Sequence, residues 1–514
     1  REKLWSERPW ISLVLGGALL ALSMPGRVRG VPWFSFVAFV PLLLQVLRGG
    51  PAWKRIRSGL FFGFVSTLPL LTWVDFTIST YGKLGHVAGW AAAILLSLYI
   101  SIYFSLFTWM LGFLVDSLGE GAVLAAPAVW SSLEIIRIKW DLGFPWLLLG
   151  YSQYGNSLTV NAAAYTGVIG LGFLIMLVNA FLSLAVHRTG TGRKGMSPLS
   201  LFSCGVLVVF FMGMLNQARL SHPPKGESSV SILVVQPAID QWKKWDSSFQ
   251  EETLEILRDL TWGFRGDLVV WPETALPFFL YWDEEPTSRF FTILQEVNVP
   301  ILTGVPWYES EKGKFFNSVV LFSPDGFMLG KYDKLKLVPF GEYVPLRPLF
   351  FFVDKLTEGG EDFSRGREVV LVKAGKISVA PSICYEAIYP VLAVEGVRRG
   401  ANLLVNVTND AWFGDTGAPY QHFAMASMRA VETGRYMVRC ANGGISAVIN
   451  WKGETEAEKP LFKRGSFTAS VPLLTGVTFY VRSANLLNSC IAGIFLLFLA
   501  AALWIRRSNH GRSF

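Results

Sequence analysis

The sequence predicts a polytopic α-helical membrane domain joined to a soluble domain of layered α/β type. Its 514 residues are 52% hydrophobic and only 16% charged, whereas charged residues make up near a quarter of an ordinary soluble protein. Apolar runs near the roughly 20 residues that cross a bilayer fill the first half of the chain and recur near its end. Between them, short apolar runs alternate with helical periodicity, which is typical of strands and helices in layers.

Eight apolar runs are predicted to span a membrane, and the fifth has the weakest pattern. A cleavable signal peptide is an alternative interpretation of residues 1–25, because Arg1, Lys3 and Arg8 precede an apolar run. The further runs that follow at once favour an uncleaved anchor. The eight runs lie at about 10–25, 32–47, 58–79, 88–115, 121–136, 160–186, 199–216 and 487–505.

The distribution of Lys and Arg over the connections predicts the orientation. With eight spans, thirteen of these residues fall on one side of the membrane and five on the other. Because basic residues are retained on the cytoplasmic side, both termini are predicted in the cytoplasm and the soluble domain outside it. The net charge of +8 is therefore a topological signal beside anionic lipid, and it implies no nucleic-acid partner. The five are Arg27, Arg29, Lys83, Arg137 and Lys139.

A fall in hydropathy at residues 222–229, which are rich in Pro, Gly and Ser, predicts a linker. It separates a membrane domain at 1–221, with seven helices, from a soluble domain at 230–478, and a last span and tail occupy 479–514. Continuous apolar runs indicate strands that are covered on both faces. Strands are predicted at 230–236, 267–273, 300–305, 317–329 (a pair), in the run that ends at Cys384, and at 402–407, 436–449 and 466–471, with helices at 247–264, 287–297, 389–399 and 420–433.

Three residues of different chemistry stand in patterned contexts of the soluble domain. Glu273 and Cys384 each end an apolar run, and Lys334 precedes a segment that Pro339, Gly341 and Pro345 would make rigid. A carboxylate, an ammonium and a thiol suit thiol acyl transfer, because the carboxylate can take the thiol proton while the ammonium meets the developing oxyanion. Each residue also has a structural interpretation. Glu273 could be a surface carboxylate and Cys384 a buried core thiol, and Lys334 could belong to a solvated lysine run in which Lys331 or Lys336 is equivalent to it.

Cysteine and histidine usage narrows the chemistry further. Cys204 and Cys490 fall in predicted spans, so that Cys384 and Cys440 are the two that could form a disulfide in an oxidising compartment. The apolar surroundings of Cys440 favour a small buried side chain instead. A Cys–His protease would have to use His422, the single histidine of residues 230–478. The sequence has no phosphate-binding loop, zinc-ligand spacing or Gly-x-Ser-x-Gly elbow.

These motifs resemble those of the nitrilase superfamily, and the whole chain resembles its membrane-embedded branch, the bacterial apolipoprotein N-acyltransferases. The resemblance implies an α-β-β-α sandwich in which Glu273 is the general base, Lys334 stabilises the oxyanion and Cys384 is the nucleophile. It implies supporting or substrate-binding roles for Trp245, Glu342, Tyr385 and Glu386. The motifs are Trp-Pro-Glu at 271–273, Tyr-Asp-Lys at 332–334, Val-Pro-Phe-Gly-Glu at 338–342, Cys-Tyr-Glu at 384–386 and Asn-Val-Thr-Asn-Asp-Ala-Trp-Phe-Gly at 406–414.

The activity implied by the resemblance is a two-step acyl transfer. An acyl chain would pass from a phospholipid, commonly phosphatidylethanolamine, to Cys384 and then to the α-amine of the N-terminal S-diacylglyceryl-cysteine of an apolipoprotein. The protein would be a monomer in the bacterial inner membrane, with its catalytic domain on the periplasmic side and without a metal or organic cofactor. Two alternatives stay open: a membrane-tethered amidase that passes the thioester to water, and a non-catalytic lipid- or peptide-binding receptor.

Two apolar stretches of the soluble domain are candidates for lipid-facing lids, with the protein core as the alternative. A connection in the membrane domain offers candidates for binding an anionic headgroup. The lid candidates are Phe278, Phe279, Trp282, Phe350, Phe351 and Phe352, and the headgroup candidates are Arg137, Lys139 and Trp146.

Overall fold

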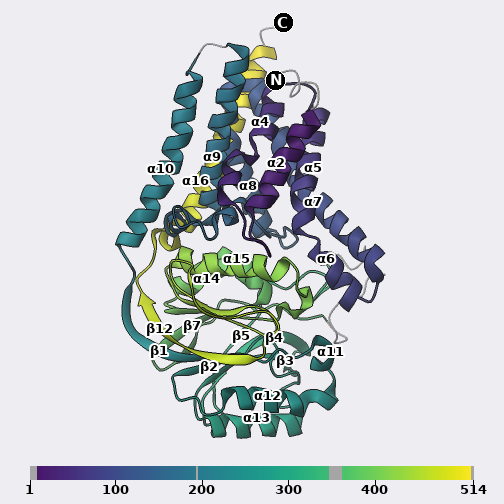
Figure 1. Cartoon of the computed structure of the whole chain (residues 1–514), viewed down its shortest axis with the longest axis vertical. Helices are drawn as coiled ribbons and strands as arrows, with labels where there is room; N and C mark the ends of the chain where they lie inside the picture. Colours follow the sequence, from purple (N-terminus) through teal and green to yellow (C-terminus); the bar gives the residue numbers. More distant parts are fainter. Residues whose placement is uncertain (1–8, 193–194, 346–361, 511–514) are drawn as a thin grey trace. The chain divides into compact units, whose positions relative to one another are not determined.

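The computed structural model describes residues 9–192, 195–345 and 362–510. They form two compact units, and many of their elements are labelled in Figure 1. The first unit comprises Arg1–Thr80, Leu84–Ser221 and Ser483–Phe514, and the second comprises Tyr81–Lys83 and His222–Arg482. The assignment of three residues from the first half of the sequence to the second unit was not expected.

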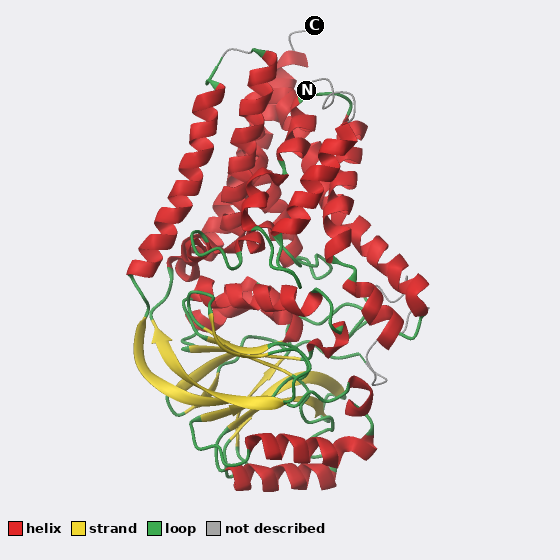
Figure 2. Ribbon diagram, in the orientation of Figure 1, coloured by secondary structure: helices red, strands yellow, loops and turns green. Residues whose placement is uncertain are grey.

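The described part of the first unit consists of helices and the turns that join them (Figure 2). Several of the helices are interrupted, because Pro and Gly stand at their ends and in their connections. The α-helices are α2 (Pro9–Ser23), α3 (Ser35–Ala38), α4 (Val40–Leu47), α5 (Ala52–Thr67), α6 (Trp73–Phe76), α7 (Gly85–Leu118), α8 (Ala126–Lys139), α9 (Ala163–Thr191), α10 (Pro198–Ser221) and α16 (Phe479–His510).

Five helical segments among the described residues are long and apolar enough to cross a membrane. A sixth is added if Ala52–Leu70 and Trp73–Tyr81, which meet at 55°, form one broken span. Pro9–Ser23 and Pro32–Leu47 are apolar but shorter, and the predicted total of eight spans therefore stays a prediction. The five are Gly85–Leu118, Glu120–Lys139, Val160–Thr191, Pro198–Ser221 and Phe479–Asn509.

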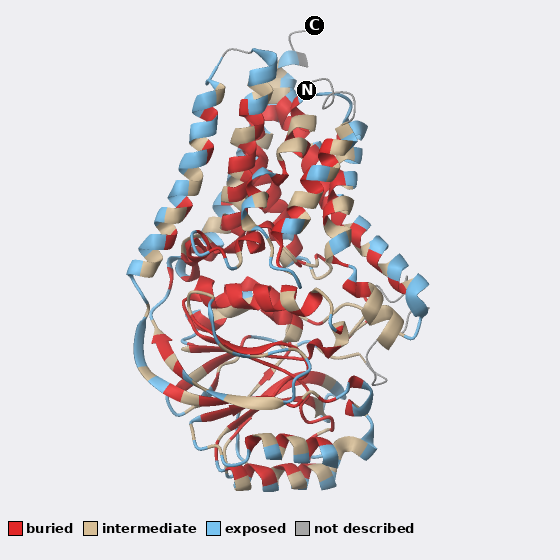
Figure 3. Cartoon of the chain, viewed as in Figure 1, coloured by how far each residue is buried: buried red, intermediate tan, exposed pale blue. Residues whose placement is uncertain are grey.

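Small residues let the helices of the first unit approach one another closely. A Cβ atom on Gly59 of α5 would collide with the backbone carbonyl of Phe104 on α7, and one on Gly63 would lie 2.9 Å from the Cα of Ser101. Helices in lipid associate through such close packing, because lipid supplies no hydrophobic drive between them. The outward faces are apolar: Leu207 and Phe210 of α10 are 62% and 64% exposed, as the pale blue of α10 in Figure 3 illustrates.

The second unit contains two six-stranded sheets. Their orders are β12-β1-β2-β3-β4-β5 and β11-β10-β9-β8-β7-β6. Parallel pairing joins β1, β2 and β3 in one sheet and β7, β8 and β9 in the other. The strands are β1 (Lys225–Gln236), β2 (Leu268–Val270), β3 (Ile301–Glu309), β4 (Lys314–Phe322), β5 (Met328–Asp333), β6 (Val372–Ala374), β7 (Ile377–Ile383), β8 (Leu403–Thr408), β9 (Met437–Ala441), β10 (Ser446–Ile449), β11 (Thr455–Lys459) and β12 (Gly465–Thr475).

The two sheets pack face to face and carry helices on their outer faces (Figure 1). Ile232 and Val270 of one sheet meet Val379 and Val405 of the other in the central core. A second core lies between the first sheet and helices α12 (Gln250–Thr261) and α13 (Glu284–Val297). Helices α14 (Pro390–Arg398) and α15 (Ala418–Thr433) cover the second sheet. The predicted α-β-β-α sandwich is therefore confirmed.

The predicted linker at 222–229 is wrong in part, because β1 begins at Lys225. Lys225 pairs with Thr475 of β12, and a bulge between Gly226 and Ser228 interrupts the ladder. Backbone hydrogen bonds to a neighbouring strand do not depend on the side chains, so that a polar segment rich in Gly and Ser can extend a strand.

Candidate active site

Glu273 lies just past the carboxyl end of β2, on the sequence Trp271-Pro272-Glu273. The residue is only 7% exposed. Its Oε1 atom accepts hydrogen bonds from Nδ2 of Asn317 at 2.8 Å and from Nζ of Lys334 at 3.5 Å. Among the described residues no hydrogen-bond donor reaches Oε2, which leaves this oxygen available to accept a proton.

Lys334 follows β5 directly and is 1% exposed. Its Nζ donates to Oε1 of Glu342 at 2.9 Å, and Nδ2 of Asn317 donates to the same oxygen at 2.9 Å. Burial alone would lower the pKa of the ammonium, but the carboxylates of Glu342 and Glu273 raise it above its ordinary value. Lys334 is therefore a fixed positive charge held between two carboxylates.

The second oxygen of Glu342 is also occupied, because Oε2 accepts the backbone N–H of Val338 at 2.9 Å. The rigid turn predicted at Pro339 to Pro345 is present in part: Phe340 has a φ of +62° and its N–H donates to the carbonyl of Tyr343 at 2.8 Å. Since both oxygens of Glu342 are engaged, this carboxylate suits a positioning role, whereas Glu273 suits the role of a base.

Cys384 is the first residue of a short 3-10 helix, Cys384–Ile388, that follows β7. Its φ of +49° is a left-handed conformation, which side chains other than Gly, Asn and Asp rarely adopt. Burial raises the pKa of the thiol well above its ordinary value, and the Glu273 carboxylate raises it further, while Lys334 acts in the opposite direction. The resting thiol is therefore protonated, and it needs a base to become a nucleophile.

The four cysteines all lie in the described part of the chain and all are free thiols. Cys440 on β9 is fully buried, and its Sγ lies 3.1 Å from the carbonyl oxygen of Val235 and 3.2 Å from that of Val270, either of which can accept its S–H. The prediction of a small buried side chain at Cys440 is confirmed, and the disulfide with Cys384 is wrong.

Glu386 joins the cysteine turn to the lysine segment. Its Oε1 accepts the backbone N–H groups of Leu335 at 2.6 Å and Lys336 at 3.0 Å, and its Oε2 accepts the N–H of Ile383 at 2.8 Å. The hydroxyl of Tyr332 lies 2.9 Å from both oxygens. Burial raises the pKa of Glu386 to about 6 against these hydrogen bonds. One carboxyl group thus fixes the spacing between the residues next to Cys384 and those next to Lys334.

We expect Glu386→Gln to lower the free energy of unfolding by about 2–4 kcal/mol, because an amide N–H₂ would face a buried N–H donor and leave it unpaired. Thermal unfolding of the purified protein in detergent measures this change. Glu395→Gln is the matched control, since Glu395 pairs with Arg399 at the surface of α14 and is expected to change stability little. Equal losses in the two variants would contradict the role assigned to Glu386.

Lys244 was not among the predicted site residues, although it lies next to Trp245. It ends the short helix α11 (Gln241–Lys244), is 3% exposed, and donates from Nζ to the backbone carbonyl of Glu273 at 2.9 Å. Burial lowers the pKa of Lys244 to about 8, against the opposing effects of Glu273 and Cys384. The side chain therefore holds the main chain of the candidate base, and the sequence signal that could have found it is the pair of lysines before Trp245.

The remaining predicted residues of the site differ in their surroundings. Trp245 is half-buried directly after α11. Tyr385 is 5% exposed, and its ring packs at 5.4 Å against that of Tyr389. Lys331 donates to the carboxylate of Asp333 at 2.8 Å, and Nζ of Lys336 lies 5.5 Å from the ring of Tyr389. Of the three lysines, Lys334 is the one that the fold brings to Glu273.

The lid candidates divide into four groups. Phe278 is 2% exposed and belongs to the core under α12 and α13, so that a lipid-facing role is wrong for it. Phe279 is half-buried and packs against Phe315 at 5.4 Å. Trp282 is 64% exposed and remains a candidate. The others, Phe350, Phe351 and Phe352, lie outside the described residues.

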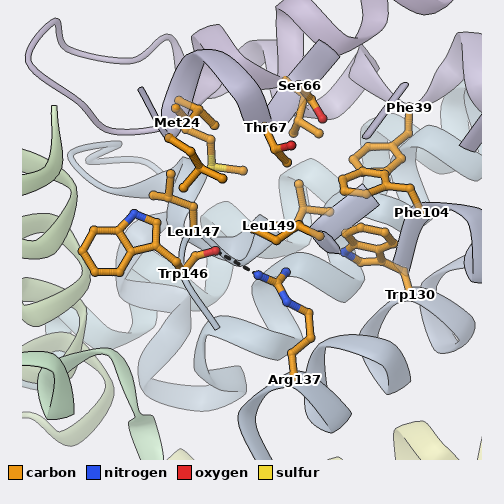
Figure 4. Close-up of a pocket in the computed structure, with 14 residues that line it drawn as sticks. Met24, Phe39, Ser66, Thr67, Phe104, Trp130, Arg137, Trp146, Leu147 and Leu149 are labelled. Atoms are coloured by element: carbon orange, nitrogen blue, oxygen red, sulfur yellow. Dashed lines mark hydrogen bonds between the residues drawn. The ribbon is translucent and has the colours of Figure 1, made fainter. Parts of the chain in front are cut away.

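Two of the three headgroup candidates are buried in the first unit. Arg137 is 3% exposed, and its Nη2 donates to the carbonyls of Phe144 at 2.7 Å and Trp146 at 3.1 Å. Arg137 and Trp146 line a small cavity of about 40 Å³ whose other walls are mostly apolar (Figure 4). A headgroup site at a membrane surface needs exposed side chains, and these two are buried. Lys139 is exposed and remains a candidate.

Comparison with known families defines the class of each part of the chain. The model of the carbon-nitrogen hydrolase family matches residues 234–476, and that of the apolipoprotein N-acyltransferase N-terminal domain matches residues 16–181. The second unit is thus a carbon-nitrogen hydrolase domain, in agreement with its sandwich of two sheets. Among solved structures, Saccharomyces cerevisiae Nit3, of branch 10 of the nitrilase superfamily, has a TM-score of 0.38 and 19% identity over 51% of this chain and 97% of its own.

Similarity to curated proteins extends over almost the full length. An apolipoprotein N-acyltransferase of Geobacter metallireducens is 37% identical over 98% of this chain and 96% of its own length. One of Methylococcus capsulatus is 34% identical over 87% of this chain and 88% of its own. The chain belongs to the apolipoprotein N-acyltransferase family.

Proposed function

We propose that the protein moves an acyl chain from a phospholipid, through a thioester on Cys384, to the α-amine of the N-terminal S-diacylglyceryl-cysteine of apolipoproteins. The observation that carries the proposal is the buried cluster of Glu273, Lys334 and Glu342. The charges of Glu273 and Lys334 act on the thiol of Cys384, which follows β7. Family membership supports the same reaction and the same acceptor.

The first half-reaction forms the thioester. Oε2 of Glu273 takes the thiol proton, and Sγ of Cys384 attacks the carbonyl carbon of a phospholipid ester. The oxyanion that develops meets the Lys334 ammonium and the backbone N–H of Tyr385. Collapse of the tetrahedral intermediate breaks the bond to the glycerol oxygen, which takes the proton back from Glu273 and leaves as a lysophospholipid.

The second half-reaction releases the acyl chain. The neutral α-amine of the acceptor attacks the thioester carbon through the same oxyanion site, and Glu273 takes a proton from the nitrogen. Expulsion of the thiolate forms the amide bond, and the thiolate recovers its proton from Glu273. Since Lys334 keeps its positive charge throughout, it suits electrostatic stabilisation and not proton transfer.

The test uses the purified full-length protein in detergent micelles with phosphatidylethanolamine. Mass spectrometry should find one acyl group on Cys384 that hydroxylamine removes. Addition of a synthetic S-diacylglyceryl-cysteinyl peptide should then transfer that group to the α-amine of the peptide. Release of free fatty acid with an unmodified peptide would favour the amidase alternative, and absence of any thioester would favour a receptor. The proposal also includes three details: the acyl chain comes from the sn-1 position of the phospholipid, phosphatidylethanolamine is the preferred donor, and the protein is a monomer.

The proposal includes an inner-membrane location, with both termini in the cytoplasm and the carbon-nitrogen hydrolase domain in the periplasm. Thirteen against five basic residues in the connections support this orientation. We expect a reporter that works only after export to be active when it is fused after Gly226 and silent when it is fused near Gly192. The reverse result would show that the number of spans before the domain is even.

A further inference from the structure

The strained conformation of Cys384 is held from its carbonyl side. A φ of +49° is unfavourable at a residue with a side chain, so the surroundings must determine it. The backbone carbonyl of Cys384 lies 3.1 Å from Nε2 of His422 and 3.4 Å from Nδ2 of Asn406. His422 is a residue of α15 and Asn406 of β8, so two separate elements hold this carbonyl.

The same carbonyl belongs to the peptide unit that supplies the candidate oxyanion donor. The C=O of Cys384 and the N–H of Tyr385 lie in one planar peptide, which is trans like every peptide bond between described residues. In a trans peptide the two bonds point in opposite directions. A group that fixes the direction of the carbonyl therefore fixes the direction of the N–H.

His422 is itself held in place by buried charged groups. It is 1% exposed, and its Nδ1 lies 3.0 Å from Oδ1 of Asp410 and 3.2 Å from Nη2 of Arg439. Asp410 also accepts from the hydroxyl of Thr408 at 2.8 Å. Burial opposes ionisation of Asp410, but the charges of Arg439 and His422 hold the pKa of this carboxyl below its usual range.

The hydrogen bond to the carbonyl determines which nitrogen of His422 carries a proton. A carbonyl oxygen only accepts, so Nε2 must be the donor. Nδ1 can then receive from Arg439 when the ring is neutral or donate to Asp410 when it is charged, and Nε2–H is present in both states. His422 is therefore not available as a base for the thiol, which argues against a Cys–His protease.

We propose that His422 is a positioning residue of the acyl-transfer site: its Nε2–H holds the Cys384 carbonyl and thereby directs the N–H of Tyr385 at the oxyanion. The hydrogen bond also polarises the peptide and makes its N–H a stronger donor. The proposal rests on the proposed function, because it gives the N–H of Tyr385 the task of meeting an oxyanion.

The test compares two reactions of the same thiol, in order to distinguish an effect of His422 on the oxyanion from an effect on the nucleophile. Thioester formation from phosphatidylethanolamine passes through an oxyanion. Alkylation by iodoacetamide forms an S–C bond with loss of iodide and passes through none. In His422→Leu we expect thioester formation to slow by on the order of 10²-fold, the effect of losing an oxyanion donor. Alkylation should stay within about threefold of the wild-type rate, since no oxyanion donor takes part in it.

Two further variants complete the design. His422→Gln keeps an N–H donor at a similar reach and should recover thioester formation to within about tenfold of the wild type. Ser427→Ala is the matched control on α15, where the hydroxyl bonds only within the helix, and it should change neither rate. Comparable melting temperatures establish that the variants are folded.

Two results would overturn the proposal. One is an unchanged rate of thioester formation in His422→Leu. The other is an equal loss of rate in thioester formation and alkylation, which would show that His422 affects the thiol and not the oxyanion. If His422→Leu does not fold, His422→Met, which also removes the N–H donor, replaces it: a tenfold or greater selective loss of thioester formation supports the proposal and no selective loss overturns it. Failure of the proposed function is a separate result, because the wild-type protein would then form no thioester while its thiol still reacts with iodoacetamide.

Discussion

Cys384→Ser is expected to form no acyl thioester and to lower acyl transfer by on the order of 10³-fold or more, as when a nucleophile that works together with its base is lost. The thiol lies where the charges of Glu273 and Lys334 act on it. A serine hydroxyl has a far higher pKa than a thiol, and one buried carboxylate would not activate it to the same extent. Single-turnover transfer of a labelled acyl chain from phosphatidylethanolamine measures the effect.

Cys440→Ala is the control for this prediction. Cys440 is buried between the strands of both sheets, and its Sγ contacts the carbonyls of Val235 and Val270. Its loss is expected to cost about 1–2 kcal/mol of stability as a small cavity, while the folded variant keeps its acyl-transfer rate. A folded Cys440→Ala that is as inactive as Cys384→Ser would refute the assignment of the nucleophile.

The part of the fold that the sequence predicts is the part with apolar patterns. Strands β2 and β8 are buried at every position and β7 at five of its seven positions, and each was predicted within a few residues. Strands β6 and β11 were missed. They are the two edges of the second sheet, and β11 has the polar sequence Thr-Glu-Ala-Glu-Lys. An edge strand is held by backbone pairing on one side, which leaves little signal in its side chains.

Some residues of the site could likewise be predicted from the sequence around them, whereas others reach the site through contacts with distant residues. Glu273, Lys334 and Cys384 stand next to strands that the sequence predicts, so their placement at strand ends could be foreseen. Lys244 and His422 reach the site over separations of 29 and 38 residues. The two lysines before Trp245 mark the neighbourhood of Lys244, but no pattern in the sequence specifies which distant residue Lys244 or His422 contacts.

The segment Tyr81–Lys83 shows the same limit on a larger scale. It lies between two helices of the first unit in sequence but packs in the second. The Tyr81 hydroxyl donates to the carbonyl of Ala411 at 3.2 Å, and its ring packs against Trp412 at 4.9 Å and Trp242 at 5.4 Å. The hydropathy of the sequence indicates only that a predicted span ends before Lys83, and it does not predict these contacts.

Glu273→Gln and Lys334→Met are each expected to lower the rate of thioester formation by on the order of 10²-fold or more, through different steps. Glu273→Gln removes the proposed base, so alkylation of Cys384 by iodoacetamide should slow as well. Lys334→Met removes the cation proposed to meet the oxyanion, and it takes away the ammonium that pairs with both Glu273 and Glu342. We therefore also expect Lys334→Met to lower the free energy of unfolding by about 3–5 kcal/mol.

The lysine run supplies the control that decides this last prediction. Lys331 has its own partner in Asp333 and is partly exposed, and the side chain of Lys336 lies over the ring of Tyr389. Lys331→Met and Lys336→Met remove the same charge from the same segment without touching Glu273, so both should retain thioester formation within a fewfold of the wild type. Parallel rate measurements on folded protein test this. If Lys336→Met is the severe variant and Lys334→Met the mild one, the oxyanion is stabilised by a different lysine, and the buried Lys334–Glu342 pair serves the fold alone.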